Sequence, residues 1–211
     1  MVEMLRDASS TRPAVYVIEE NGARAVVKDF GGNGFLFRNL VGRFLVWREE
    51  KAYRRLKGVK GTPILYRVLD GRALILEHIP GGSLERARDT AMLSPAFFEE
   101  LKRVVEEFHG RGICHCDLKR AANILIGTDG KPYVLDWSAA ILQTEFRLFP
   151  LNLVYQRFIL DDFNAVTKHQ LRHCPESVSP EAQERYVYRS KAEKTIRALR
   201  DRLREFLQRV A

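Results

Sequence analysis

Short apolar runs separated by turn residues fill much of the first third of the chain, a pattern typical of antiparallel strands. Residues 15–19 and 23–29 form one pair of β-prone runs, joined by an Asn-Gly pair that tolerates the positive φ angles of a tight hairpin. Residues 65–69 and 73–79 form a second pair around Asp-Gly. The pattern predicts a small antiparallel sheet made of hairpins.

Helical spacing replaces this alternation in four other segments. Residues 48–56 carry charged side chains between apolar ones, and we expect Trp47 and Tyr53 to face the sheet. A second helix is predicted from Ser94-Pro95 to Gly110, because serine caps a helix well and proline suits its first turn. The remaining helical segments are predicted at 151–172 and 179–211.

The most informative motif is His-Cys-Asp-Leu-Lys, in which the carboxylate is Asp117 and the cation is Lys119. Asn123 comes shortly after it, and Asp136 comes after a short apolar run. Phosphoryl transfer needs a group that positions the acceptor hydroxyl, cations near the phosphates, and oxygen ligands for Mg²⁺. Asp117 and Lys119 suit the first two tasks, and Asn123 and Asp136 suit the third. Phosphoryl transfer is therefore the first hypothesis.

The segment between the two metal-ligand candidates reads as a hairpin. Residues 124–126 and 133–135 are short apolar runs around a Thr-Asp-Gly turn. Pairing of these runs brings Asn123 and Asp136 to the same end. Their order, their spacing and the intervening hairpin together argue against a chance combination of a surface turn and a strand end.

This arrangement resembles the catalytic loop and metal-binding aspartate of the protein-kinase-like superfamily, whose signatures are H-R-D-L-x-x-x-N and D-F-G. The resemblance implies an α+β, bilobal fold: a small antiparallel sheet with one helix, then a truncated, mainly helical lobe. It implies a nucleotide clamp at 1–79 and a catalytic lobe at 80–211, together one kinase-like domain. The implied cofactors are ATP and Mg²⁺, with Mn²⁺ as an alternative ion.

Two departures from the family pattern are visible. Asn123 lies six residues after Asp117 where the family has five, so one extra residue must bulge within 119–122. Asp136 is followed by Trp-Ser where the family has Phe-Gly, which removes a flexible glycine and suggests a fixed metal loop. Neither departure deletes a chemical group that the reaction needs, but a nucleotide-binding pseudokinase scaffold stays open as an alternative.

The resemblance also places an ATP clamp upstream. Lys28 ends an Ala-Val-Val-Lys run that looks like the phosphate-gripping strand, and Val26 shares its face and would cover the adenine ring. The partner of Lys28 should be a glutamate on the following helix. We expect Glu49 to be this partner because Tyr53 lies one turn further on, and Glu50 is the alternative.

The adenine edge would be read by backbone groups of Glu77 and Ile79, because the following Pro-Gly-Gly-Ser-Leu resembles a kinase hinge. No G-x-G-x-x-G precedes Lys28, and Gly22 is the only glycine in the hairpin that leads to it. We therefore expect the plain turn at 20–22 to cover the phosphates.

The residues after the motif narrow the choice of acceptor. Only 75 residues come after Asp136, and no Ala-Pro-Glu sequence closes an activation segment, so a peptide-docking protein kinase is not expected. The sequence resembles the small lipopolysaccharide core kinases over roughly residues 15–136, with a further likeness at residues 161–175. This resemblance implies a hydroxyl of a Kdo or heptose sugar, or of another lipid-linked sugar, as acceptor. Rio-type kinases share these motifs, so a Rio-like Ser/Thr protein kinase or ATPase stays open.

Composition adds a bias in charge. Lys and Arg number 35 against 27 Asp and Glu, and a net charge of +8 favours an anionic partner such as a phosphorylated glycolipid, an anionic membrane or RNA. No apolar run approaches the ~18 residues that span a bilayer, and residues 1–13 lack the apolar stretch of a signal peptide. We therefore expect a cytoplasmic protein, either free of lipid or peripheral on the inner face of the plasma membrane, with its oligomeric state open.

Cysteines and surface aromatics complete the picture. Three cysteines offer no disulfide framework or C-x-x-C pair, so reduced thiols without a metal are expected. Near the first predicted helix, aromatic residues alternate with arginines: Phe35, Phe37, Arg38, Arg43, Phe44, Trp47 and Arg48. These residues either touch a membrane surface or, as is more common, place their aromatic rings in the core and their arginines in solvent.

Overall fold

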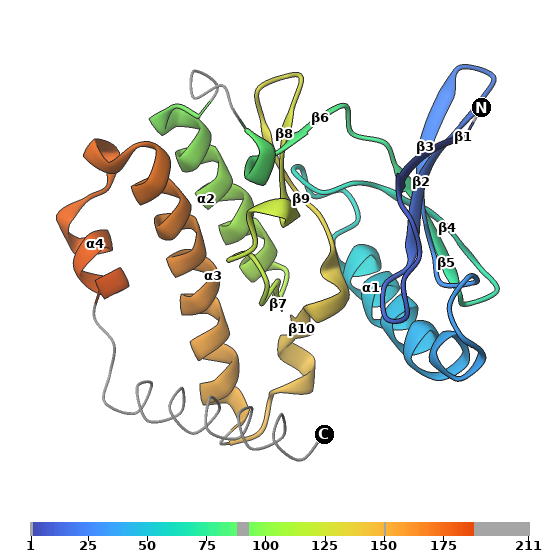
Figure 1. The fold of residues 1–211 in the computed structure, drawn as a ribbon. Helices are drawn as coiled ribbons and strands as arrows, with labels where there is room; N and C mark the ends of the chain where they lie inside the picture. Colours follow the sequence, from blue (N-terminus) through green and yellow to red (C-terminus); the bar gives the residue numbers. More distant parts are fainter. Residues whose placement is uncertain (1, 88–92, 150, 188–211) are drawn as a thin grey trace, which may run out of the picture.

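The computed structural model describes residues 2–87, 93–149 and 151–187 of the chain. A five-stranded antiparallel sheet lies beside a mainly helical part (Figure 1). The sheet has the order β1-β2-β3-β5-β4, with strands β1 (Val2–Arg6), β2 (Ala14–Glu20), β3 (Ala23–Asp29), β4 (Leu65–Leu69) and β5 (Ala73–Glu77). The predicted fold class, α+β with a small antiparallel sheet followed by helices, is confirmed.

Both predicted hairpins are present, and their turns use the residues that tolerate positive φ. Asn21 and Gly22 have φ angles of 51° and 78° between β2 and β3. Asp70 and Gly71 have φ angles of 50° and 62° between β4 and β5. The local turn chemistry therefore fixes the register of two pairs of strands.

One strand of the sheet, β1, lies outside the predicted elements. All five of its side chains are exposed, so no buried face gives it an alternating pattern. It is held by antiparallel pairing with β2, in which Val2 lies opposite Ile18 and Arg6 opposite Val15. The sheet thus has five strands where the sequence pattern predicts four.

The first helical segment is longer than predicted and faces the sheet differently. The π-helical η1 (Phe37–Gly42) leads directly into α1 (Arg43–Arg55), which packs against β4 and β5. Tyr53 is buried as predicted, together with Val46 and Ala52. Trp47 is 50% exposed, so the prediction that it faces the sheet is wrong.

The second part of the chain starts with β6 (Gly81–Ser83), which pairs with β8 (Ile124–Gly127) and not with the first sheet. β8 and β9 (Pro132–Val134) form the predicted hairpin. α2 (Pro95–Gly110) begins where predicted, and the Ser94 hydroxyl accepts a hydrogen bond from the Phe97 N–H.

The other elements of this part are short turns and strands and two helices. They are η2 (Leu84–Arg86), β7 (Ile113–Cys114), η3 (Ala121–Asn123), η4 (Trp137–Ala139), β10 (Ile141–Leu142), η5 (Gln143–Glu145), α3 (Leu151–His173), η6 (Pro175–Ser177) and α4 (Pro180–Val187). The predicted last helix is present over α4, and its continuation to 211 lies outside the described residues. No helix in the part of the chain that is described is long and apolar enough to cross a membrane.

One hydrophobic core joins the sheet to the helical part. Leu74 of β5, Tyr53 of α1 and Trp137 of η4 belong to the same buried cluster as the inner face of α2. α2 contributes side chains that are 5% exposed or less: Phe97, Phe98, Leu101, Val104, Val105 and Phe108. The sheet and the helices therefore bury a common apolar surface, which holds the two parts in one geometry.

Gly61 marks a close approach between the two parts. Its carbonyl accepts a 2.8 Å hydrogen bond from the Val134 N–H of β9, and its φ angle is +78°. A Cβ atom at this position would lie 2.8 Å from both methyl groups of Val104 and 3.2 Å from the Pro132 carbonyl oxygen. No side chain fits there without a shift of α2 or β9.

Replacing Gly61 with alanine should lower the free energy of unfolding by about 2–4 kcal/mol, because it adds overpacking against Val104 to the cost of positive φ. Gly58→Ala is the matched control, since Gly58 has φ +82° but nothing lies within 4 Å of its added Cβ. The control should lose only about 1–2 kcal/mol. Urea unfolding measured by circular dichroism gives both values, and equal losses would contradict the packing argument.

Candidate active site

Lys28 stands at the centre of a buried ion cluster that joins three elements. Its Nζ lies 2.6 Å from Glu49 Oε2 on α1 and 2.7 Å from Asp136 Oδ1 in the segment after β9. The side chain of Glu49 is 1% exposed and that of Lys28 is 11% exposed. Glu50 pairs with Arg54 at the surface of the same helix. The predicted pairing of Lys28 with Glu49, and not with Glu50, is therefore present.

The three charges shift one another's pKa values. Burial alone would lower the pKa of Lys28, but the carboxylates of Glu49 and Asp136 raise it above its usual range. Burial alone would raise the pKa of Asp136, but Lys28 lowers it far below its usual range, and Ser138 adds to this with a 2.8 Å hydrogen bond to Oδ1. Burial raises the pKa of Glu49, and Lys28 offsets this only in part. The cluster thus keeps Lys28 cationic and Asp136 anionic at neutral pH.

Asp117 and Asn123 are in contact although one extra residue separates them. Asn123 Nδ2 donates to Asp117 Oδ2 at 3.1 Å and to the Asp117 carbonyl oxygen at 3.0 Å. The turn η3 absorbs the extra residue, since the Asn123 N–H donates to the Arg120 carbonyl. The Leu135 N–H donates to the Asn123 carbonyl at 2.8 Å, which places Asn123 beside the residue before Asp136. The hairpin therefore brings the two candidate metal ligands to one end, as predicted.

Asp162 of α3, a residue without a predicted role, holds in place the loop that leads to Asp117. It is 2% exposed, and its oxygens accept hydrogen bonds from the His115 N–H at 2.8 Å and the Cys116 N–H at 3.0 Å. These bonds fix Cys116 at φ +68°, a conformation that costs a non-glycine residue roughly 1–3 kcal/mol. An Asp-Asp pair within a helix gives no sign of which member is buried, so the sequence offers no signal for choosing Asp162 over Asp161.

His115 and Trp137 form the buried side of the site. His115 Nδ1 accepts the Asp117 N–H at 3.2 Å, so we assign the ring hydrogen to Nε2, which donates to the Leu135 carbonyl at 2.9 Å. Trp137 is fully buried, and its ring centroid lies 4.7 Å from those of His115 and Phe108. The Trp-Ser pair after Asp136 thus places tryptophan in the core and serine on the carboxylate, which is in keeping with a fixed loop.

Lys119 is engaged in an ion pair with α3. Its Nζ lies 3.2 Å from Asp161 Oδ1, which Arg157 also contacts at 3.3 Å. Arg120 is the cation beside Asp117, at 3.6 Å from Oδ2. The side chain of Lys119 is 45% exposed, so a role at the transferring phosphoryl group requires it to leave Asp161.

The predicted adenine contacts lie where β5 leaves the sheet. Val26 is half-buried and lies opposite Leu76 in the register of β3 and β5, on the same face as Lys28. The Glu77 N–H donates to the Ile64 carbonyl at 2.8 Å, so this N–H is not available to a ligand. Ile79 comes two residues later, before β6. The roles of Val26, Glu77 and Ile79 stay predictions.

The turn at 20–22 cannot cover phosphates gripped by Lys28, and this expectation is corrected. The turn joins β3 at Ala23, five residues from Lys28, which at ~3.3 Å per residue is about 17 Å away. The loop 7–13 between β1 and β2 lies at the Lys28 end, because Arg6 pairs with Val15 and Val15 with Lys28. The error arises from the missed strand β1, because the loop between β1 and β2, and not the turn at 20–22, lies at the Lys28 end of the sheet.

Loop 7–13 has polar side chains and a defined anchor. Asn33, which is 5% exposed, donates through Nδ2 to the carbonyls of Ser9 and Arg12. The Ser9 N–H also donates to the Arg12 carbonyl, so the loop closes on itself. A residue in the turn after β3 therefore fixes the loop next to the strand that carries Lys28.

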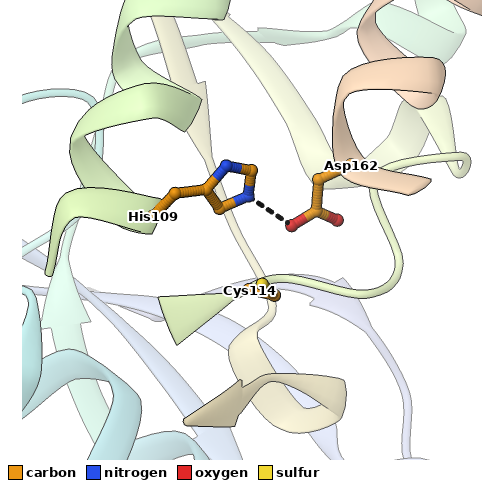
Figure 2. Close-up of side chains that lie close together, drawn as sticks. All are labelled: His109, Cys114 and Asp162. Carbon is orange, nitrogen blue, oxygen red and sulfur yellow. Dashed lines mark hydrogen bonds and ion pairs between the residues drawn. The ribbon is translucent and has the colours of Figure 1, made fainter. Parts of the chain in front are cut away.

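His109, Cys114 and Asp162 lie close together, with candidate metal-ligand atoms within 4.8 Å of one another (Figure 2). The His109 Nε2 lies 3.2 Å from Asp162 Oδ2, and both oxygens of that carboxylate already accept backbone N–H groups. Burial, together with the charge of Asp162, raises the pKa of the Cys114 thiol to about 12, so the thiol stays protonated. A hydrogen-bonded structural cluster explains these residues without a metal.

A cavity of about 740 Å³ lies between the end of α1, the loop 57–63, β4 and the β8–β9 turn. Of the predicted site residues it contains only Glu77. Neither the charged cluster around Lys28 nor the pair Asp117 and Asn123 lines this cavity.

Asp162→Asn should lower the free energy of unfolding by about 2–4 kcal/mol, because the new amide turns a donor toward a buried backbone N–H. The same change at the neighbouring Asp161 is the matched control, and it removes only partly exposed ion pairs worth about 1 kcal/mol or less. Urea unfolding measures both. A loss at Asp161→Asn as large as at Asp162→Asn would refute the assignment of Asp162 as the residue that holds the loop.

Comparison with known proteins gives one partial similarity. No family model matches the chain. The chain is 32% identical over 77 residues to CBL-interacting serine/threonine-protein kinase 15 of Arabidopsis thaliana, a match that covers 35% of this chain and 18% of that protein. The chain thus spans less than a fifth of that relative. With the fold and the site geometry, the match supports a protein-kinase-like relationship and gives no information on the lipopolysaccharide-core or Rio-type branches.

Proposed function

We propose that the protein is an ATP- and Mg²⁺-dependent kinase that transfers the γ-phosphoryl group of ATP to an acceptor hydroxyl. The observation that carries this proposal is the cluster at Lys28, where one ammonium meets the carboxylates of Glu49 and Asp136 from two other elements. Asp117 and Asn123 lie on the adjoining loop. Groups suited to the nucleotide, the metal and the acceptor therefore meet in one place, and phosphoryl transfer depends mainly on such positioning.

The nucleotide would lie between the sheet and the catalytic loop. Lys28 would neutralise phosphate charge, and Glu49 would hold its ammonium in position. Val26 would lie against the adenine ring, while the Glu77 carbonyl and the Ile79 N–H would meet its polar edge. Loop 7–13 would cover the phosphates through backbone N–H groups and the hydroxyls of its serine and threonine residues.

The oxygen atoms that remain in the site suit Mg²⁺. Asp136 uses Oδ1 for Lys28 and Ser138, and Asn123 uses Nδ2 for Asp117. Asp136 Oδ2 and Asn123 Oδ1 are therefore available as ligands, and Mg²⁺ favours a few such oxygens completed by phosphate and water. Bound there, the ion would neutralise charge on the phosphates during transfer.

Asp117 would orient the acceptor hydroxyl and accept its proton. Its carboxylate is partly exposed and is held by the Asn123 amide on one side and approached by Arg120 on the other. The hydrogen bond from its own N–H to His115 Nδ1 fixes the backbone from which it projects. Asp117 is thus positioned by contacts that do not involve a ligand, as general-base catalysis requires.

The acceptor we favour is a sugar hydroxyl, on a free or lipid-linked sugar such as a lipopolysaccharide core. Residues 137–149, which lead from Asp136 toward α3, form two short turns and a two-residue strand held to β7 and α1. This short segment supports a small acceptor over a docked peptide. The net charge of +8 supports an acceptor that carries anionic groups.

A Ser/Thr side chain of a protein is the second candidate acceptor. The observation that favours it is the partial similarity to a serine/threonine-protein kinase. Both candidates use the same catalytic residues, so they differ only in what reaches Asp117.

Glu49→Gln should weaken binding of Mg²⁺-ATP about tenfold or more, because Lys28 loses its buried counter-charge and its fixed position. Glu50→Gln is the matched control on the same helix, and its affinity should stay within about twofold of wild type. Isothermal titration calorimetry measures both without any acceptor. Equal affinities for the two variants would remove Glu49 from the nucleotide site.

Label from γ-³²P-ATP, offered with Mg²⁺ to membrane glycolipid, generic protein and RNA fractions, should enter the glycolipid fraction. Asp117→Asn should retain Mg²⁺-ATP binding and lower transfer by roughly 10²–10⁴-fold, the usual worth of a general base. Label in protein alone would establish the second candidate. Binding of ATP without transfer to any fraction, in wild type as in Asp117→Asn, would indicate a pseudokinase scaffold.

A further inference from the structure

The helix that carries Glu49 presents a second apolar face to solvent. Residues 35–55 form one continuous helical segment through η1 and α1, at the lower edge of the sheet side in Figure 1. Its outer face carries six large apolar side chains that are 43–71% exposed: Phe35, Leu36, Leu40, Val41, Phe44 and Trp47. We call these six residues the apolar stripe. Soluble proteins rarely expose so many large apolar side chains together, and such a set commonly marks an interaction surface.

The apolar stripe is distinct from the face that packs into the core. Val46, Ala52 and Tyr53 are 4% exposed or less and face the protein interior. Phe44 and Trp47 lie on the other side with their ring centroids 5.8 Å apart. Of the four aromatic residues in the segment 35–47, Phe37 alone packs inward, 6.4 Å from the Phe30 ring. The expectation that these four rings belong to the core is therefore wrong for the other three.

The charges along this helix are predominantly positive. Its basic residues are Arg38, Arg43, Arg48, Lys51, Arg54 and Arg55, and its two acidic residues are both engaged. Glu49 is buried against Lys28, and Glu50 pairs with Arg54. The Lys51 Nζ lies 5.3 Å from the ring centroid of Trp47. Arg48 and Lys51 pair with Glu145, so among the described residues Arg38, Arg43 and Arg55 are the cations of this helix without a carboxylate partner. The Arg38 guanidinium lies 5.5 Å from the ring centroid of Phe35, so the stripe keeps an excess of positive charge beside it.

We propose that the apolar stripe docks the protein on an anionic lipid surface. A helix with Trp, Phe and Leu on one face and Arg and Lys beside it has the composition of an interfacial membrane helix. The aromatic rings would enter the headgroup region, and the cations would meet lipid phosphates. A second copy of this chain is a poorer partner, because a symmetric contact would bring the same cations face to face. The proposal does not depend on phosphoryl transfer.

The two tryptophans of the chain allow a direct test on the unmodified protein. Trp47 is 50% exposed, whereas Trp137 is fully buried, so a change in emission on adding vesicles reports Trp47. Phosphatidylcholine vesicles with about 30% phosphatidylglycerol should shift the emission to shorter wavelength, and phosphatidylcholine alone should not. Raising NaCl to about 0.5 M should weaken the effect, because salt screens the attraction between cations and lipid phosphates. An unchanged spectrum would overturn the proposal.

Variants identify the surface that binds. Leu40→Asp combined with Phe44→Asp should weaken binding to the anionic vesicles by about tenfold or more in a flotation assay. Val187→Asp is the matched control, since Val187 is 69% exposed on α4, far from α1 in Figure 1, and it should bind like wild type.

Three outcomes would count against the stripe. Undiminished binding by the Leu40/Phe44 variant would place the contact elsewhere, for example in the arginine-rich residues 188–211. A shift of Trp47 emission with protein concentration in the absence of lipid would identify a second copy as the partner. If the double variant fails to fold, Trp47→Phe should abolish the lipid-dependent shift, and persistence of that shift would refute the assignment.

Discussion

A buried lysine stays cationic where opposite charges compensate its burial, and Lys28 imposes that condition on the rest of the structure. Its two partners come from different elements: Glu49 from α1 and Asp136 from the segment after β9. The sheet, the helix and the segment must therefore all be in place before the charge is compensated. Loss of Lys28 would leave the buried Glu49 carboxylate without its counter-charge, at a cost of several kcal/mol. The cluster thus couples the folding of the two parts of the chain to the geometry of the site.

A second set of charges holds the same helix to the same segment. Glu145 lies 2.7 Å from both Arg48 and Lys51 of α1, and Arg48 also donates to the Ala140 carbonyl. Burial alone would raise the pKa of Glu145, but its hydrogen bonds to Arg48 and Lys51 lower it to about 2. Because α1 is held both at Glu49 and at these two neighbouring cations, the position of Glu49 is set by the protein alone. This is preorganisation in the physical sense, since no ligand has to order these groups.

Local sequence patterns predict most of the fold and the polar residues of the site, because turn chemistry and alternation are local properties. The Asn-Gly hairpin and the Ser94 cap depend on neighbouring residues, and so does the position of Lys28 on its strand. The strand β1 and the role of Asp162 do not depend on neighbouring residues. The exposed strand β1 is defined by pairing with β2, and Asp162 is defined by backbone groups 46 and 47 residues away. Long-range partners of this kind produce no periodic pattern in the sequence. Without β1, the loop between β1 and β2 cannot be recognised, and the turn at 20–22 is wrongly predicted to lie over the phosphates.

Helix α1 shows why a periodic pattern cannot decide function alone. The segment 35–55 has two apolar faces, and spacing does not say whether Tyr53 or Trp47 turns inward. The ion pair with Lys28 decides it, because Glu49 must point toward Lys28 and Tyr53, one turn further on, must then enter the core. Trp47 and Phe44 are then exposed to solvent. The same constraint that assembles the charged site therefore leaves the exposed stripe on the outer face of the helix that carries Glu49.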